Sequence, residues 1–334
     1  MQHVANSTKG FSYGSKRVRF WEWLVVLSMT SYGQEYTFET IMRNFKTKFQ
    51  IRSEYSSTFK YLGMNLTQLP DKSIKIDQNS YVDSIKQIEI SAEDSKEPLK
   101  LLNEKQVSLL RGIVGQLNWL AGISRPEISF QVSELSSRVK ISTISDLKSA
   151  NKVVKFVKMN PSYIIFPKLR GPLTLKVFVD ASFANLHDGG SQGGNIIFLC
   201  DGNNSSPILW NSSRIKRIAR STLAAETHAC SDSCDAASYL SFLLKEMLPT
   251  NEKMPIEVYT DCKSLFDNAF TSNQVSERNL RVHIASIREF IGSEEVTLVR
   301  IPSEHQLADI LTKKGPSPQK LMQVLRDGVL PCFE

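Results

Sequence analysis

The order of apolar patterns after residue 172 constrains the fold of this chain most strongly. Alternating or continuous apolar runs predict strands, and apolar residues at helical spacing predict helices. The predicted strands cover 173–183, 195–200, 207–211, 256–260 and 296–301, and the predicted helices cover 221–247, 264–270 and 280–291. Three strands come first, followed by a long helix, a strand, two helices and a last strand. This order predicts an α/β domain with five strands and flanking helices.

The first half of the chain shows weaker and more varied patterns. Apolar spacing predicts helices over 38–49, from about 80, over 104–120 and from Arg125-Pro126, and a hairpin of 59–66 with 74–77 around the turn 70–72. The stretch PKLRGP at 167–172 marks a domain boundary. We expect a leader over 1–35 without regular structure, an α+β segment over 36–168, the α/β domain over 169–315 and a tail over 316–334.

Composition limits the setting and the partners. Lys and Arg exceed Asp and Glu by 41 to 34, so the net charge of +7 suits a polyanionic partner. Five cysteines without a paired framework disfavour a disulfide scaffold. The apolar run 21–29 contains Glu22 and is far shorter than the roughly 20 residues that span a bilayer, so we expect no membrane helix and a cytoplasmic or nuclear protein.

Four acidic residues lie where a predicted strand ends or a predicted helix begins, which is where an α/β fold places groups that reach a ligand. They are Asp180, Glu226, Asp261 and Asp309. Each one alone would be interpreted as a surface charge or a helix cap. Together they would repel one another unless cations bind between them, and oxygen ligands suit Mg²⁺ or Mn²⁺. Two such ions roughly 4 Å apart can stabilise both oxygens of a phosphodiester exchange.

The combination of motifs resembles a known family, the copia-type retrotransposon Pol polyprotein. The motifs are FVDASFAN at 178–185, GGSQGG at 189–194, RSTLAAE at 220–226, YTDCKSL at 259–265 and QLADILTKK at 306–314. FKYLG at 59–63, IDQNSY at 76–81, GIVGQLNWL at 112–120 and SRPEISF at 124–130 are similar to the segment that precedes them in such polyproteins. The resemblance covers about 36–326. It implies an RNase H-like domain, with a mixed five-stranded sheet and flanking helices, after a truncated reverse transcriptase thumb or connection-like segment.

This resemblance also implies a function and a set of site residues. It implies an RNase H-type endonuclease that cuts the RNA strand of RNA–DNA hybrids with two Mg²⁺ or Mn²⁺ ions. The same four acids would bind the metal and be catalytic. Residues that would contact nucleic acid are Ser182, Arg220, Ser221, Thr222, Lys263 and Arg281, with the expected turn 191–194 near the edge of the site. Other Pol chains are a second candidate partner. Segment 29–34 lacks the paired aspartates of a polymerase site, so we expect no polymerase activity.

Other patterns leave alternatives open. A nucleic-acid binder without catalysis and an inactive remnant are both compatible with the motifs, and the oligomeric state is open. His228, Cys230 and Cys234 could suggest zinc, but we interpret them as a buried helix face. His283 and His305 are interpreted as packing and surface residues, and Lys313, Lys314 and Lys320 as either a nucleic-acid contact or a solvated face.

Overall fold

The computed structural model describes residues 57–248, 254–271, 275 and 277–331. All of them belong to one compact unit that runs from Arg52 to Glu334. The predicted leader 1–35, the predicted helix 38–49 and segment 29–34 lie outside the described residues.

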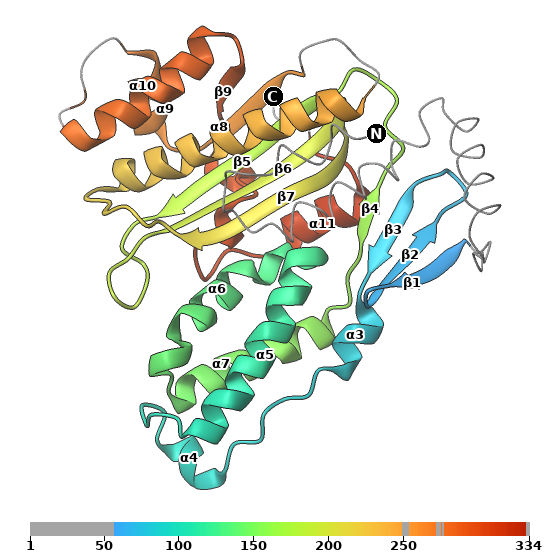
Figure 1. The fold of residues 1–334 in the computed structure, drawn as a ribbon, viewed down its shortest axis with the longest axis vertical. Helices are drawn as coiled ribbons and strands as arrows, with labels where there is room; N and C mark the ends of the chain where they lie inside the picture. Colours follow the sequence, from blue (N-terminus) through green and yellow to red (C-terminus); the bar gives the residue numbers. More distant parts are fainter. Residues whose placement is uncertain (1–56, 249–253, 272–274, 276, 332–334) are drawn as a thin grey trace, which may run out of the picture. The chain divides into compact units, whose positions relative to one another are not determined.

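The second half of the chain forms the predicted mixed sheet, with strand order β7-β6-β5-β8-β9. The strands are β5 (Thr174–Ser182), β6 (Gln192–Asp201), β7 (Asn204–Arg214), β8 (Ile256–Thr260) and β9 (Val296–Arg300). β5, β6 and β7 pair antiparallel (Figure 1), whereas β8 pairs parallel with both β5 and β9. This order confirms the predicted α/β fold class with one mixed five-stranded sheet.

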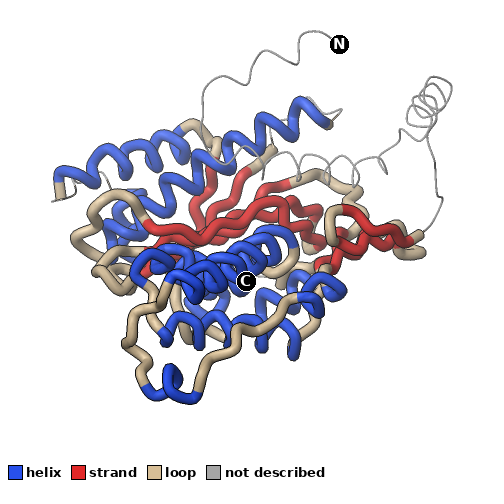
Figure 2. The backbone as a smooth tube through the Cα atoms, turned by 60° about the horizontal axis from the view of Figure 1, so that its bottom comes forward, coloured by secondary structure: helices blue, strands red, loops and turns tan. Residues whose placement is uncertain are grey.

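Helices cover the sheet on both sides (Figure 2). Those that follow the hairpin strands are α8 (Thr222–Met247), α9 (Lys263–Phe270) and α10 (Arg278–Gly292). Ser221 caps α8, because its side chain accepts a hydrogen bond from the Ala224 amide. Buried Ala224, Ala225 and Ala229 let the first turns of α8 approach the sheet closely.

The first half of the described chain contains a smaller antiparallel sheet. Its strands are β1 (Thr58–Tyr61), β2 (Met64–Gln68), β3 (Ile74–Asp77) and β4 (Ile164–Phe166), in that order. The prediction of one strand over 59–66 was wrong: the chain reverses at Leu62 and Gly63, whose φ angles are 47° and 80°. Gly63 permits this tight turn because it has no Cβ. The predicted hairpin therefore joins β2 to β3, and β1 is exposed along its length.

A cluster of helices lies between β3 and β4 in the chain and has its own apolar core. The helices are α3 (Asn79–Ser84), α4 (Ala92–Lys96), α5 (Glu104–Ile123), α6 (Ser129–Arg138) and α7 (Ile144–Met159), with the 3-10 turns η1 (Pro126–Ile128) and η2 (Val139–Ile141). Asn103 and Gln106 form a capping box at the start of α5. Pro126 opens η1, as expected for a residue that lacks an amide donor.

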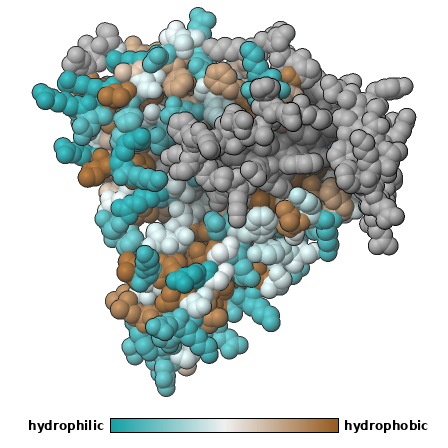
Figure 3. Space-filling model, viewed as in Figure 1, coloured by the Kyte–Doolittle hydropathy of each residue, from teal (hydrophilic) through white to brown (hydrophobic). Residues whose placement is uncertain are grey.

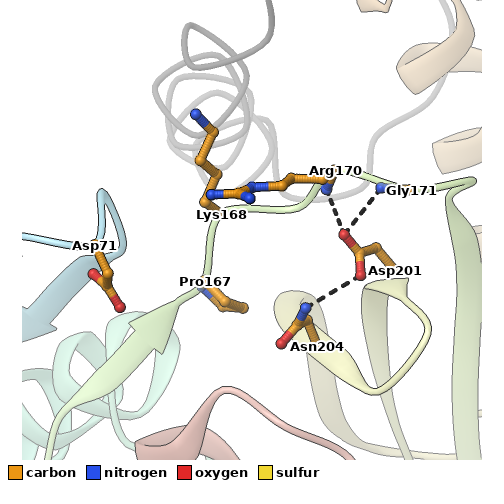
Figure 4. A pocket seen from close by; sticks show the side chains of 7 residues that line it. All are labelled: Asp71, Pro167, Lys168, Arg170, Gly171, Asp201 and Asn204. Atoms are coloured by element: carbon orange, nitrogen blue, oxygen red, sulfur yellow. Dashed lines mark hydrogen bonds between the residues drawn. The ribbon is translucent and has the colours of Figure 1, made fainter.

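The helical cluster contacts the large sheet directly. The Trp210 indole donates to the Ala121 carbonyl at 2.7 Å, and the Gln192 amide donates to Ser133 Oγ at 3.1 Å. The linker between the small and large sheets is held by Asp201, whose carboxylate accepts hydrogen bonds from the amides of Arg170 and Gly171 at the rim of a shallow polar pocket (Figure 4).

The chain ends with two 3-10 turns and a helix. They are η3 (Ser303–His305), η4 (Asp309–Leu311) and α11 (Gln319–Asp327). Helix α11 contacts β4 and β7 and buries Leu321, Met322, Val324 and Leu325. Its last turn is fixed by Arg326, which donates to the Pro161 carbonyl at 3.0 Å.

Some large apolar side chains stay exposed on the helical cluster, namely Leu99, Leu101, Leu109, Ile141 and Met159. Figure 3 shows apolar surface mixed with polar surface over this lower part of the molecule. No helix within the described ranges is long and apolar enough to cross a membrane.

Candidate functional site

Three aspartates from three separate elements meet at one edge of the large sheet. Asp180 lies near the end of β5, Asp261 directly follows β8, and Asp309 opens η4. Because β5 and β8 are parallel neighbours, their ends lie at the same edge. One carboxylate oxygen of each aspartate lies within 4.8 Å of the other two, a spacing that could hold a metal ion. We call these three residues the aspartate cluster.

Glu226, the fourth predicted acid, lies beside this cluster in the first turns of α8. Its side chain is 4% exposed and accepts a hydrogen bond from the Ala181 amide, which directly follows Asp180. Its Oε2 atom has no hydrogen-bond partner among the described residues. A buried carboxylate oxygen without a donor is costly, so the residue fits a position beside a cation.

The segment after β9 surrounds Asp180 with donors. The Thr312 hydroxyl donates to Asp180 Oδ2, and the Lys313 ammonium lies 2.9 Å from Asp309 Oδ1 and 3.7 Å from Asp180 Oδ2. Gln306 donates from Nε2 to the Val179 carbonyl at 2.9 Å, which fixes the segment to β5. These bonds bring Asp309 to the end of the sheet.

Burial and like charges shift the protonation of these acids. Burial, with smaller contributions from the charges of Asp309 and Asp261, raises the pKa of Asp180 to about 7 against the opposing effects of Lys313 and Thr312. Burial, followed by the charges of Asp180 and Asp261, also raises the pKa of Glu226 well above its usual value. Because these acids resist ionising together, a bound divalent cation that prefers oxygen ligands would stabilise their ionised forms.

The charges of the aspartate cluster also shift the pKa of the Lys313 ammonium. Burial acts to lower the pKa of its ammonium, but Asp180 and Asp309 together raise that pKa above its usual value. The side chain therefore stays charged beside the cluster. The four acids therefore offer only oxygen atoms as ligands. The Lys313 ammonium beside them is positively charged and cannot bind a metal ion, so the site fits a divalent ion that prefers oxygen.

The raised pKa of Asp180 predicts how the stability of the metal-free protein depends on pH. The folded state keeps a proton on Asp180 that the unfolded state loses near pH 3.8, so this stabilising contribution is lost as pH rises toward about 7. We expect the melting temperature in EDTA to fall between pH 5 and pH 8, and to fall less in Asp180→Asn. Differential scanning fluorimetry of both proteins tests this, and equal pH slopes would contradict it.

The predicted nucleic-acid contacts take different positions around the site. Ser182 ends β5, and Ser221 donates from Oγ to Glu277 Oε1 at 2.9 Å while it caps α8. Arg220, Thr222, Lys263 and Arg281 are exposed. Arg281 also donates from Nε to the Val275 carbonyl at 3.0 Å, which ties it to its own segment.

The expected turn at 191–194 was wrong, because Gln192, Gly193 and Gly194 begin strand β6. Ser191 lies just before the strand and accepts a hydrogen bond from the Ala184 amide at 3.0 Å. Gly194 lies against Leu311 and Thr312. It is therefore part of the surface on which residues 306–313 pack, and we call these residues the η4 segment.

Two residues at the site were not assigned to it from sequence. Thr312 had no predicted role, and Lys313 was weighed only as a nucleic-acid contact or a solvated charge. The spacing Asp309 to Lys313 is the i, i+4 spacing of an ion pair, and the structure contains that pair. This spacing was the signal that could have found Lys313.

His228, Cys230 and Cys234, the residues that could suggest zinc, are not part of the aspartate cluster. Cys230 and Cys234 are buried in α8, which confirms the interpretation as a buried helix face. The His228 ring packs edge to face on His283 from α10, with ring centres 4.6 Å apart. Within the described ranges, the aspartate cluster is the group of three or more such side chains whose ligand atoms could meet at one metal ion.

Sequence comparison finds relatives among transposon polyproteins. The chain is 30% identical over 208 residues to the retrovirus-related Pol polyprotein from transposon RE1 of Arabidopsis thaliana, which is 61% of this chain and 14% of that protein. It is 27% identical over 183 residues to a putative transposon Ty5-1 protein of Saccharomyces cerevisiae, covering 52% and 58%, and 24% identical over 253 residues to the Ty1-JR2 Gag-Pol polyprotein of that yeast, covering 73% and 13%.

The chain therefore spans about one seventh of the length of the Arabidopsis relative. These relatives confirm the resemblance to copia-type Pol polyproteins that the motifs indicate. No protein-family profile matches the chain.

Similar solved structures include RNase H domains and a viral reverse transcriptase. LC11-RNase H1 aligns with a TM-score of 0.32 and 18% identity, covering 42% of this chain and 92% of that one. The foamy viral protease-reverse transcriptase in complex with RNA/DNA hybrid aligns with a TM-score of 0.41 and 14% identity, covering 78% and 31%.

Proposed function

We propose that this homologue of copia-type Pol polyproteins is an RNase H-type endonuclease that cuts the RNA strand of RNA–DNA hybrids. The observation that carries the proposal is the aspartate cluster, three carboxylates from β5, β8 and η4 within 4.8 Å at one edge of a mixed five-stranded sheet. Four acids in the expected motifs and a relative that is a Pol polyprotein support the same reaction class.

The acids have distinct roles in this proposal. Asp180, Asp261 and Asp309 would bind divalent metal, Mg²⁺ or Mn²⁺, and Glu226 would supply a further oxygen through its unpartnered Oε2. Bound metal would supply a nucleophilic water and would stabilise the charge on the leaving oxygen. Thr312 orients Asp180 by donating to its Oδ2, and Gln306 keeps the η4 segment on the sheet.

The substrate follows from the class of site. Hydrolysis of a phosphodiester requires that the nucleic-acid backbone be held at the edge of the sheet. Arg220 lies on the segment that leads to Glu226, Lys263 lies on the segment that follows Asp261, and both side chains are exposed. A hybrid duplex offers 2′-hydroxyls on only one strand, which is how a site of this kind would select the RNA strand. Other Pol chains remain a candidate partner, and polymerase activity is not part of the proposal.

Strand-specific cleavage is the direct test. The full chain should cut the labelled RNA of an RNA–DNA hybrid in Mg²⁺ or Mn²⁺ and stop in EDTA, while leaving the DNA strand and a DNA duplex intact. If a folded and metal-loaded chain leaves the hybrid uncut but binds it, the protein is a binder. If it neither binds nor cuts, an inactive remnant is the better description.

Replacing Arg220 by Ala is expected to weaken hybrid binding without changing the fold. Arg220 is exposed just before the Ser221 cap, so its charge is free to face a phosphate. Loss of one phosphate contact should lower the slope of log affinity against log salt by about 1. Fluorescence anisotropy over a salt series measures this slope.

Lys245→Ala is the matched control for Arg220→Ala. Lys245 is exposed in the last turn of α8, at the opposite end of that helix and roughly 35 Å away at 1.5 Å per residue. It removes the same charge far from the aspartate cluster and should leave the salt slope unchanged. Equal slopes for the two variants would exclude a role of Arg220 in binding.

A further inference from the structure

Lys313 occupies an unusual position for a lysine, because its ammonium lies between two members of the aspartate cluster. Nζ is 2.9 Å from Asp309 Oδ1 and 3.7 Å from Asp180 Oδ2, and the side chain is 39% exposed. Its neighbour Lys314 is 63% exposed and pairs with Glu134 on α6 instead. Consecutive lysines therefore have separate environments, and only the first of them faces the cluster.

The backbone that carries Lys313 is held in place. The Asn185 side chain donates to the Thr312 carbonyl at 2.8 Å, and Ser212 Oγ donates to the Leu311 carbonyl at 2.6 Å. The Thr312 side chain is fully buried, and its hydroxyl donates to Asp180 Oδ2 and also lies 3.1 Å from the Asp309 carbonyl oxygen. Because these bonds fix residues 311 and 312, the approach of the ammonium to the cluster is built into the fold and differs from a chance surface pair.

We propose that Lys313 is an internal counter-cation that stabilises the aspartate cluster without metal and competes with divalent metal for Asp180 and Asp309. This inference rests on the proposed function, since it assumes that the cluster binds metal. An ammonium and a divalent ion are both attracted to these carboxylates and repel each other. Lys313 therefore lowers metal affinity while it holds the acids together, and it sets the metal concentration at which the site fills.

The test compares neutral variants of the two lysines. Mn²⁺ binding to the full chain is measured by isothermal titration calorimetry, and the melting temperature in EDTA is measured in parallel. Removing the competing charge in Lys313→Met should tighten Mn²⁺ binding by about 10-fold, a typical coupling between two sites, and should lower the metal-free melting temperature at pH 8. Lys314→Met, which removes a lysine that pairs with Glu134 and not with the cluster, should leave the Mn²⁺ affinity unchanged. Lys313→Gln, which keeps a hydrogen-bond donor, provides the same comparison if the Met variant does not fold without metal.

The outcomes separate this inference from the proposed function. Tighter Mn²⁺ binding together with a lower metal-free melting temperature supports the counter-cation. Equal or weaker Mn²⁺ binding by both folded Lys313 variants overturns it while the metal site itself stands. If folded wild type, Lys313→Met and Lys313→Gln all bind no Mn²⁺, the metal site of the proposed function is excluded as well.

Discussion

Replacing Asp180 by Asn is expected to reduce hybrid cleavage by about 10³-fold or more, because several kcal/mol of charge stabilisation by metal would be lost. Asp180 is the most buried member of the aspartate cluster, at 2% exposure, and lies within reach of both other members. Asn has the same shape and can still accept the Thr312 hydroxyl hydrogen bond, so β5 should keep its packing. Single-turnover cleavage of labelled hybrid with saturating substrate measures the loss.

Two measurements separate a lost metal ligand from a lost fold. Circular dichroism and melting should show a folded Asp180→Asn protein, with a melting temperature in EDTA at pH 8 at least equal to that of wild type, because a buried charge has been removed. Asp267→Asn on the exposed side of α9 removes the same charge outside the cluster and should cut normally. Wild-type cleavage by Asp180→Asn would exclude this site as the catalytic one.

The large sheet could be predicted from sequence because its elements have strong local patterns. The runs around Val177 and Val258 are buried strands, and the long helix begins at a serine cap. A strand that ends in an acid places that acid at the sheet edge whatever the rest of the fold does, so Asp180 and Asp261 could be expected to meet.

Other parts of the site depend on tertiary packing, which local sequence patterns do not fix. Thr312 and Lys313 reach Asp180 only because the η4 segment folds back across the end of β6, and nothing in residues 306–314 alone fixes that register. The turn at Leu62 was missed for a related reason. An alternating run continued through Gly63, and the pattern of side chains does not reveal a positive φ.

The close approach of β6 to the η4 segment makes Gly194 a second sensitive position. A Cβ added at Gly194 would lie 2.7 Å from Leu311 Cβ, 2.8 Å from Thr312 Cγ2 and 3.2 Å from the Leu311 carbonyl carbon. The first two distances are too short for carbon atoms, and the third involves backbone, so the segment must move. Glycine is therefore required here for close approach, and the adjacent Gly193 is not subject to the same contact.

Replacing Gly194 by Ala is expected to destabilise the protein by about 1–3 kcal/mol through overpacking. It should also reduce cleavage by about 10²-fold, because a shift near 1 Å would carry Asp309 and Thr312 away from Asp180. Gly193→Ala is the matched control, since its Cβ would face Ile215 Cγ1 at 3.3 Å and Ala229 Cβ at 3.5 Å on the α8 side. Urea unfolding and single-turnover cleavage of labelled hybrid by both variants measure the two effects. A Gly194→Ala protein with wild-type stability and wild-type cleavage would show that the η4 segment is not held against β6 at this point.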